Sequence, residues 1–184
     1  ENHVKSGKIK VVLSDIVVQE SKRHIAARVK EVCGIVNIAR NSALKVYNEH
    51  LISSIGMNEM FRIVESEDDI IAKEEKVFDD FLCAIDAEIL GTDLIDINSV
   101  LSDYFGAKPP FEESGKKKSE FPDAFIAQQI RNRFGETETV VIVSNDKGFI
   151  RACRESENHL FFNSLGALYN AISKEDAAYD DTIA

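Results

Sequence analysis

The chain has 184 residues, which is enough for one ordinary domain with a hydrophobic core. A hydrophobic fraction of 44% and a charged fraction of 29% are typical of a soluble globular protein, and no apolar run approaches the roughly 18 residues of a membrane span. The net charge of -10 excludes a general nucleic-acid coat, because duplex binding depends on a basic surface, but it does not exclude a nuclease with clustered catalytic acids.

The first predicted element is a strand over residues 8–13, followed by a helix over about 15–32 that begins with a serine or aspartate cap. Glu20 falls on the same side of this helix as apolar residues such as Ile16. This placement is unusual for a surface glutamate and indicates a site residue. A partly buried, salt-bridged glutamate is the alternative interpretation. His24 lies one turn further on and is interpreted as a core or supporting residue.

Three elements are predicted next: helices over about 34–55 and about 68–90, and a short extended segment over 61–64. They lie between the first and the last recognisable strands, so we interpret them as a helical insert over about 34–90. The prediction is therefore a single domain over residues 1–173, followed by an acidic, frayed tail over residues 174–184.

A short helix over about 98–105 is followed by one long loop, residues 106–120, which is rich in proline, glycine and charged residues. Near its end the loop carries a basic patch of Lys116, Lys117 and Lys118. This patch is either a solvated charge run or a surface that steers phosphate groups toward a site.

The next helix begins near Pro122, which suits a first turn because its missing N–H is not needed there. Asp123 lies in line with Ile126 and Ile130 on the inward face of this helix. Asp123 is therefore a candidate site residue. A surface carboxylate favoured by the helix dipole is the alternative.

Alternating strands and helices complete the chain: a strand over 139–143, a helix over 147–155, a strand over 160–162 and a helix over 164–172. This pattern predicts an α/β fold with a parallel sheet and right-handed crossovers. The strand over 139–143 ends abruptly in Ser144, Asn145 and Asp146. It therefore carries a carboxylate to the sheet edge where α/β folds keep their chemistry. Capping of the following helix is the alternative role for Asp146.

Glu20, Asp123 and Asp146 are expected to meet at the same end of one sheet. Three carboxylates so placed would repel one another strongly without a metal ion. Mg²⁺ or Mn²⁺ relieves this repulsion, because these ions bind carboxylate oxygens and keep several waters. A divalent ion also lowers the pKa of a bound water and stabilises charge that develops on phosphorus-bound oxygens. The three acids therefore predict a metal site for phosphodiester chemistry.

Three segments resemble the PIN-domain nucleases in their order and spacing. Residues 144–149 (SNDKGF) are similar to the T/S-x-D-x-D-F element of that family, and residues 121–126 (FPDAFI) are similar to its D-A-x-I helix. Residues 12–20 are similar to its second strand and the helix that bears a glutamate. The likeness covers about residues 8–173 and is closest to a bacterial PIN-like subfamily with a helical insert.

The resemblance implies a Rossmann-like parallel sheet with flanking helices and a helical insert. It also implies a Mg²⁺- or Mn²⁺-dependent endoribonuclease that hydrolyses single-stranded RNA, with DNA as a second candidate substrate. The residues that it implies are Glu20, Asp123 and Asp146 as metal ligands and catalytic residues, Ser144 and Asn145 as supporting residues, and Lys116, Lys117 and Lys118 as nucleic-acid-binding residues.

Two features depart from the family pattern. Gly148 stands where the family often has an aspartate, and the family begins with a central strand that ends in an aspartate. Residues 1–7 instead resemble the end of the helix that follows that strand. The alternative hypothesis is therefore a catalytically inactive PIN-like module that binds RNA or a protein partner. The chain as given is expected to be weakly active at most and to associate, as a homodimer or with a regulatory partner, because a missing middle strand leaves sheet edges unpaired.

The cysteines Cys33, Cys83 and Cys153 are far apart and odd in number, and the four histidines are scattered. These spacings exclude the usual structural zinc sites. Reduced, buried thiols in a cytoplasmic protein without a membrane segment are the simplest interpretation.

Overall fold

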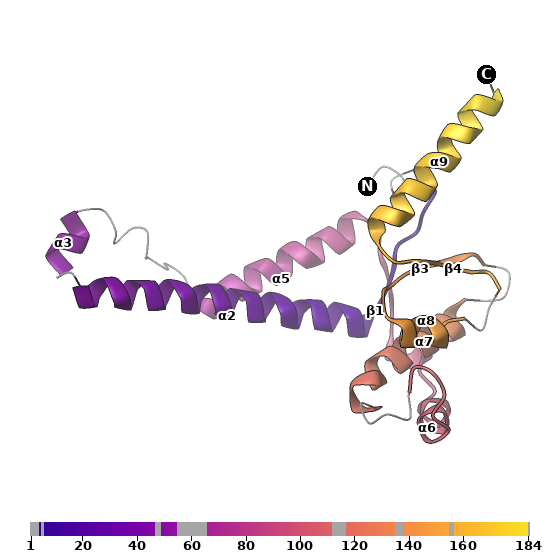
Figure 1. The fold of residues 1–184 in the computed structure, drawn as a ribbon, viewed down its shortest axis with the longest axis horizontal. Coiled ribbons are helices and arrows are strands. Elements are labelled where there is room, and N and C mark those ends of the chain that lie inside the picture. The colour runs from indigo at the N-terminus through magenta and orange to yellow at the C-terminus, as the bar shows by residue number, and fades with distance from the viewer. Residues whose placement is uncertain are drawn as a thin grey trace. The chain divides into compact units, whose positions relative to one another are not determined.

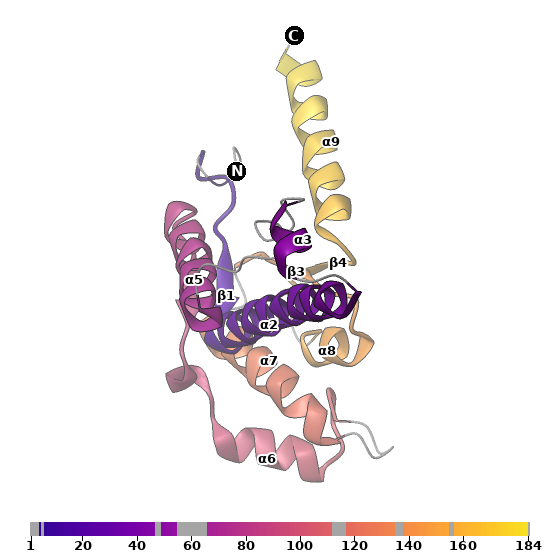
Figure 2. The same ribbon diagram turned by 90° about the vertical axis from the view of Figure 1, so that its left-hand side faces the viewer.

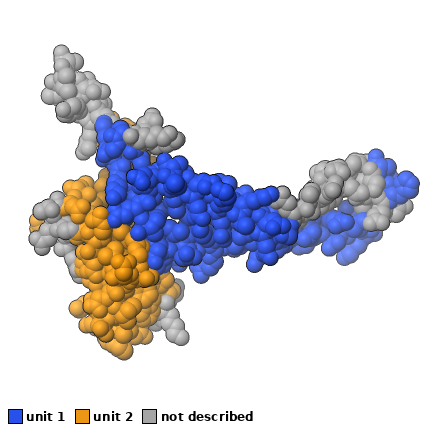
Figure 3. Space-filling view, turned by 180° about the vertical axis from the view of Figure 1, so that it is seen from behind, with its two compact units in different colours: residues 1–89 blue, residues 90–184 orange. Residues whose placement is uncertain are grey.

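The computed structural model describes residues 4, 6–46, 49–54, 66–111, 117–134, 138–154 and 157–183. The chain divides into two compact units, which are Glu1–Ile89 and Leu90–Ala184 (Figure 3). The described elements of unit 1 are β1 (Val12–Ser14), α2 (Asp15–Val46), α3 (Glu49–Ser54) and α5 (Glu67–Ala84), followed by β2 (Glu88–Leu90), which crosses the boundary (Figure 1).

The helix α2 is one unbroken element of 32 residues, so the prediction of two helices separated near Gly34 is wrong. A glycine lowers helix stability by about 1 kcal/mol relative to alanine, but unlike proline it removes no backbone hydrogen bond. No atom lies within 4 Å of the position that a Cβ of Gly34 would occupy. One unfavourable position therefore does not end a helix that has good helix formers such as Lys30 and Glu31 before it and Ala39 and Arg40 after it.

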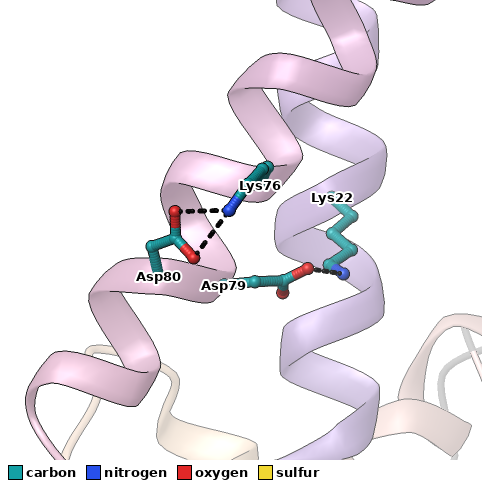
Figure 4. A network of polar contacts seen from close by, with 4 residues as sticks. All are labelled: Lys22, Lys76, Asp79 and Asp80. Carbon is teal, nitrogen blue, oxygen red and sulfur yellow. Dashed lines mark hydrogen bonds and ion pairs between the residues drawn. The ribbon is translucent and has the colours of Figure 1, made fainter.

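The helices α2 and α5 lie side by side in unit 1 (Figures 1 and 2). The strand β1 leads directly into α2, and α5 leads into β2. The two strands pair, and the backbone N–H of Glu88 donates to the carbonyl of Val11 at 2.9 Å. The Nζ of Lys22 on α2 also lies 2.7 Å from Oδ2 of Asp79 on α5 (Figure 4). The start of α2 is therefore next to the end of α5, and the two helices form an antiparallel hairpin.

The helix α5 begins where Ser66 caps it, with the Ser66 hydroxyl accepting a hydrogen bond from the N–H of Asp69 at 3.2 Å. It ends at Ala84, so the prediction of a helix to about residue 90 is wrong. Asp86 has φ of 49°, a left-handed conformation that ends the helix, and β2 follows. The predicted extended segment over 61–64 lies outside the described residues.

Unit 2 continues with the 3₁₀ turn η1 (Thr92–Leu94), α6 (Ile97–Phe105), the 3₁₀ turn η2 (Lys117–Glu120), α7 (Phe121–Arg133), β3 (Val140–Val143), α8 (Lys147–Ala152), β4 (His159–Phe162) and α9 (Leu165–Ile183). The strands β3 and β4 pair in parallel, with Val140 opposite His159 and Val143 opposite Phe162. This pairing confirms the predicted strands and their parallel direction. Since such pairs need a crossover, α8 lies between them in the chain, as the α/β class requires.

Two apolar clusters hold unit 2 together. In the first cluster, α7 contributes Ala127, β3 contributes Ile142, and α8 contributes Phe149 and Ala152. In the second cluster, Val100 of α6, Phe111 of the following loop and Ala124 of α7 are buried among aromatic rings. The helix α7 is shared by both clusters and is therefore fixed on two sides.

The C-terminal helix α9 runs to Ile183, well past the predicted end near residue 172. The helix therefore includes residues 174–183, which were predicted to belong to a frayed acidic tail. Alanine, lysine and glutamate in this stretch favour a helix, and the acidic composition by itself does not oppose one. Among the described residues the strands form two pairs, β1–β2 and β3–β4.

Candidate functional site

Asp146 is held at the carboxyl end of β3 by two hydrogen bonds. Its backbone N–H donates to the Ser144 hydroxyl at 3.1 Å, and its Oδ1 accepts from the N–H of Phe149 at 2.8 Å. Asp146 is therefore the N-cap of α8, which was the alternative interpretation of this residue. Its side chain is exposed, as is that of Asn145. A carboxylate offers two oxygens with several lone pairs, so capping by Oδ1 leaves capacity for a ligand.

Asp123 lies in the first turn of α7, directly after Pro122, as predicted. Its side chain is half-buried, and the next residue, Ala124, belongs to the second apolar cluster. One turn further on, Ala127 packs in the first cluster together with Phe149. Ala127 lies four residues after Asp123, and Phe149 lies three residues after Asp146. The first apolar cluster therefore supports both the turn that contains Asp123 and the turn that contains Asp146.

The loop before η2 contacts both of these turns. Phe111 is buried, and its ring centroid lies 5.1 Å from that of Phe121, the first residue of α7. A Cβ built on Gly148 would lie 3.6 Å from the carbonyl oxygen of Pro110 and 3.1 Å from Oδ1 of Asp146. Pro110 and Phe111 thus bridge the start of α7 and the start of α8. The first turns that carry the two acids therefore lie on one side of unit 2.

Pro110 and Phe111 lie in the long loop over residues 106–120, and no role was predicted for them from the sequence. The signal that was available is the pair of prolines before Phe111 in an otherwise polar loop. An apolar anchor of this kind indicates a loop that is packed rather than solvated.

Glu20 lies on α2 in unit 1, whereas Asp123 and Asp146 belong to unit 2. Its side chain is 43% exposed, and its Oε1 lies 3.8 Å from a guanidinium nitrogen of Arg23, one turn away. This contact fits the alternative of a partly buried, ion-paired glutamate. His24 is exposed, so it is not a core residue, and the other predicted role, that of a supporting residue, stays a prediction.

Within the described ranges, no three His, Cys, Asp or Glu side chains are grouped closely enough to hold a metal ion. The shared metal site of Glu20, Asp123 and Asp146 therefore stays a prediction. Lys116 lies outside the described residues. For Lys117 and Lys118 the structure describes the backbone, in η2, and not the side chains. Their role in binding nucleic acid also stays a prediction.

Comparison with protein families matches the PIN domain family over residues 1–149. This stretch is more than half of the chain and contains Glu20, Asp123 and Asp146, so the chain belongs to the PIN-domain family. PIN domains are in general nucleases, which are hydrolases, and they typically use divalent metal ions. Comparison with curated proteins gave no match, and comparison with solved structures gave none either. In the described part of the chain, no helix has both the length and the apolar character of a membrane span.

Proposed function

We propose that this chain is a metal-dependent endoribonuclease that hydrolyses phosphodiester bonds of single-stranded RNA in the cytoplasm. The observation that carries the proposal is the position of Asp146, a carboxylate fixed by Ser144 and Phe149 at the end of β3. The family match and the nearby first turn of α7, with Asp123, support it. Because the match spans both units, the proposal treats residues 1–173 as one PIN domain with a helical insert over about 34–90.

The donor chemistry of the proposed residues fits a hard divalent cation. Asp123, Asp146 and Glu20 offer carboxylate oxygens, which Mg²⁺ and Mn²⁺ prefer over softer ligands. When bound, such an ion supplies a water of lowered pKa and neutralises charge on phosphate oxygens. In this proposal the three acids hold the ion, and Ser144 keeps the Asp146 backbone in the orientation that presents its carboxylate.

The lysines 116–118 are proposed to attract the phosphate backbone toward the acids. A chain with a net charge of -10 repels RNA at long range, so a local basic segment is needed to offset that repulsion. Replacing all three lysines with alanine should raise KM about tenfold and leave kcat within about twofold, because the contacts are equal in the ground and transition states. A fall in kcat at unchanged KM would contradict this role.

The decisive experiment measures cleavage of a fluorescent single-stranded RNA with Mn²⁺ or Mg²⁺. The variant Asp146→Asn keeps the capping ability of the residue and removes its charge, so cleavage should fall by more than roughly 100-fold, since even residues outside a ligand shell cost 10–100-fold. Asp96→Asn is the matched control. Asp96 also caps a helix, accepting from the N–H of Asn98 at 3.0 Å, and its variant should cleave at the wild-type rate.

Chelation with EDTA should abolish cleavage by wild-type protein and leave its fold intact. Cleavage that persists in EDTA, or that is equal in Asp146→Asn and wild type, would contradict metal-ion catalysis at this site. Parallel reactions with single-stranded DNA and duplex RNA identify the substrate class.

The second candidate function is a non-catalytic PIN module that binds RNA or a protein partner. Gly148 favours it, because the resembling motif has an acid at that position. The local roles of Glu20 and Asp146, as an ion pair and a cap, favour it too, because they require no metal. RNA binding by fluorescence anisotropy in EDTA, together with no cleavage under any metal condition, would support this alternative over the nuclease.

A further inference from the structure

Phe105, the last residue of α6, presents an aromatic ring at the surface of unit 2. It is 80% exposed, which is the largest value among the exposed large hydrophobic side chains of the described residues. Single apolar residues at a protein surface are common and need no function. Phe105 differs from such a residue because other groups hold its ring in place, and a fixed aromatic ring can stack on a second ring.

The ring of Phe105 packs against the second apolar cluster. It makes an edge-to-face contact with the ring of Tyr104, with centroids 5.2 Å apart and planes at 74°. Tyr104 in turn stacks on Phe121, with centroids 5.1 Å apart and planes at 28°. An edge-to-face contact covers at most one face of the Phe105 ring, so its high exposure leaves at least one face open to solvent.

The backbone on both sides of Phe105 is also fixed. The N–H of Gly106 donates to the carbonyl oxygen of Ser102 at 2.9 Å. The N–H of Lys108 donates to the carbonyl oxygen of Asp103 at 3.0 Å, and the side chains of these two residues form an ion pair at 3.4 Å. A side chain that is already held in place loses little conformational freedom when it binds a ligand, and this favours affinity.

The aromatic contacts connect Phe105 to the candidate site, because α6 packs against α7 (Figure 2). The two centroid distances place the rings of Phe105 and Phe121 no more than about 10 Å apart. Asp123 lies in the same turn of α7 as Phe121 and is rotated from it by about 200°. Phe105 and Asp123 therefore flank the start of α7 on opposite sides, and a ligand that reaches both passes the turn η2, which ends directly before Phe121.

The loop between α6 and α7 is not acidic, unlike the chain as a whole. Residues 106–120 contain four lysines and three glutamates, a net charge of +1, whereas the whole chain has a net charge of -10. Three of these lysines are residues 116–118, of which two lie in η2. Local charge decides how a polyanion approaches a surface, so a phosphate backbone meets less repulsion here than over the rest of the chain.

We propose that the ring of Phe105 stacks on a base of single-stranded RNA, at a nucleotide that flanks the bond to be cleaved. This inference rests on the proposed nuclease function for the identity of the ligand. Stacking on an aromatic ring tolerates any base, because every base has a π face. The bases of a duplex already stack on one another, so the contact selects single strands.

A protein partner is the competing ligand, because the same side of α6 exposes Leu101 and Ile97, one and two turns before Phe105. The two ligands make different demands on residue 105. A protein contact depends on apolar area, which leucine also provides, whereas stacking depends on an aromatic ring. The path from Phe105 past η2 to Asp123 favours RNA, since it joins the ring to lysines and to a proposed metal ligand.

Fluorescence anisotropy in EDTA tests the proposal, because it measures binding of a labelled single-stranded RNA of about 12 nucleotides without cleavage. Phe105→Ala and Phe105→Leu should each raise the Kd about tenfold, a typical effect of one lost base stack, and Phe105→Trp should bind at least as tightly as wild type. The matched control is Tyr169→Ala. Tyr169 is an aromatic residue of α9 that is 61% exposed, and its variant should bind RNA like wild type.

RNAs with one abasic site locate the contact. Wild-type protein should lose the most affinity when the abasic site stands at one particular position. Phe105→Ala should lose little further affinity with that RNA, because the variant and the abasic site remove the same interaction. Additive losses at every position would contradict a direct contact between Phe105 and a base.

The outcomes separate this inference from the proposed function. Cleavage that Asp146→Asn abolishes, with RNA affinity that the Phe105 variants leave unchanged, would overturn the stacking contact and leave the nuclease intact. RNA affinity that depends on Phe105, with no cleavage under any metal condition, would support the stacking contact and contradict the nuclease. Equal affinity of Phe105→Leu and wild type would overturn stacking, as would the absence of RNA binding by wild-type protein at about 100 µM.

Discussion

The carboxylate of Asp146 accepts a hydrogen bond from the backbone N–H of Phe149 at 2.8 Å. The same residue is the proposed metal ligand, so a structural role and a chemical role coincide in one side chain. Two substitutions distinguish these roles, because asparagine caps a helix as well as aspartate does, whereas alanine does not.

Asp146→Ala should therefore lower the free energy of unfolding by about 1 kcal/mol, the usual cost of a lost N-cap, whereas Asp146→Asn should change it by less than about 0.5 kcal/mol. Urea denaturation followed by far-UV circular dichroism measures both values. Equal losses for the two variants would show that the charge of Asp146, rather than its capping oxygen, stabilises the start of α8.

The effect of Gly148→Ala on the free energy of unfolding should depend on whether Asp146 caps α8. The added Cβ would lie 3.1 Å from Oδ1 of Asp146, which is closer than ordinary van der Waals contact. A glycine-to-alanine change without strain stabilises a protein by about 0.4–1 kcal/mol. We expect that gain in the Asp146→Ala background, where the close oxygen is absent, and a smaller gain or a loss in the wild-type background. A double-mutant cycle of urea midpoints gives the coupling energy, and additive effects would refute the steric argument.

Phe111→Ala should be strongly destabilising, by about 3–5 kcal/mol, because the ring is buried against Tyr104 and Phe121. Phe105→Ala is the matched control on the same aromatic cluster. Phe105 is 80% exposed, so its truncation should cost less than about 0.5 kcal/mol. Thermal or urea unfolding distinguishes the two, and a small cost at Phe111 would mean that the loop is not the anchor between α7 and α8.

The sequence predicted well those parts of the fold that depend on local signals. Pro122 set the start of a helix, and the β-branched run before Ser144 predicted β3 and the placement of Asp146. One of the errors has a nonlocal cause. The strand β2 has three residues, too few for a periodic pattern, and it is defined by pairing with β1. Gly34 looked like a helix end, but one glycine costs only about 1 kcal/mol relative to alanine, and α2 continues through it.

In the candidate site, too, the features set by local signals were predicted and those set by nonlocal contacts were not. The positions of Asp123 and Asp146 in their own turns follow from capping and proline rules, which are local. The contact of Pro110 with Gly148 joins residues 38 positions apart, and no periodic pattern reports such a contact. The grouping of Glu20 with the other two acids depends on tertiary arrangement and stays a prediction.

Gln129 gives a prediction with a defined pH dependence. Its side chain is fully buried, and Nε2 donates to the carbonyl oxygens of Leu90 at 3.2 Å and Gly91 at 3.0 Å. Gln129→Leu removes both donors and should cost about 1–3 kcal/mol at any pH. Gln129→Glu introduces a carboxyl group that can donate to a carbonyl only when it is protonated.

Burial and these acceptors raise the folded-state pKa of the introduced carboxyl above its unfolded value of about 4.3. The protonated group therefore supports the fold below the unfolded pKa, and this support is lost as the pH rises through the folded pKa. The deficit of Gln129→Glu relative to Gln129→Leu should be larger at pH 7 than at pH 4, by about 1.4 kcal/mol for each unit of pKa rise. Urea unfolding of both variants at the two pH values measures the difference. A deficit that is equal at both pH values would show that the introduced carboxyl reaches water and that this part of α7 is less tightly packed than the structure indicates.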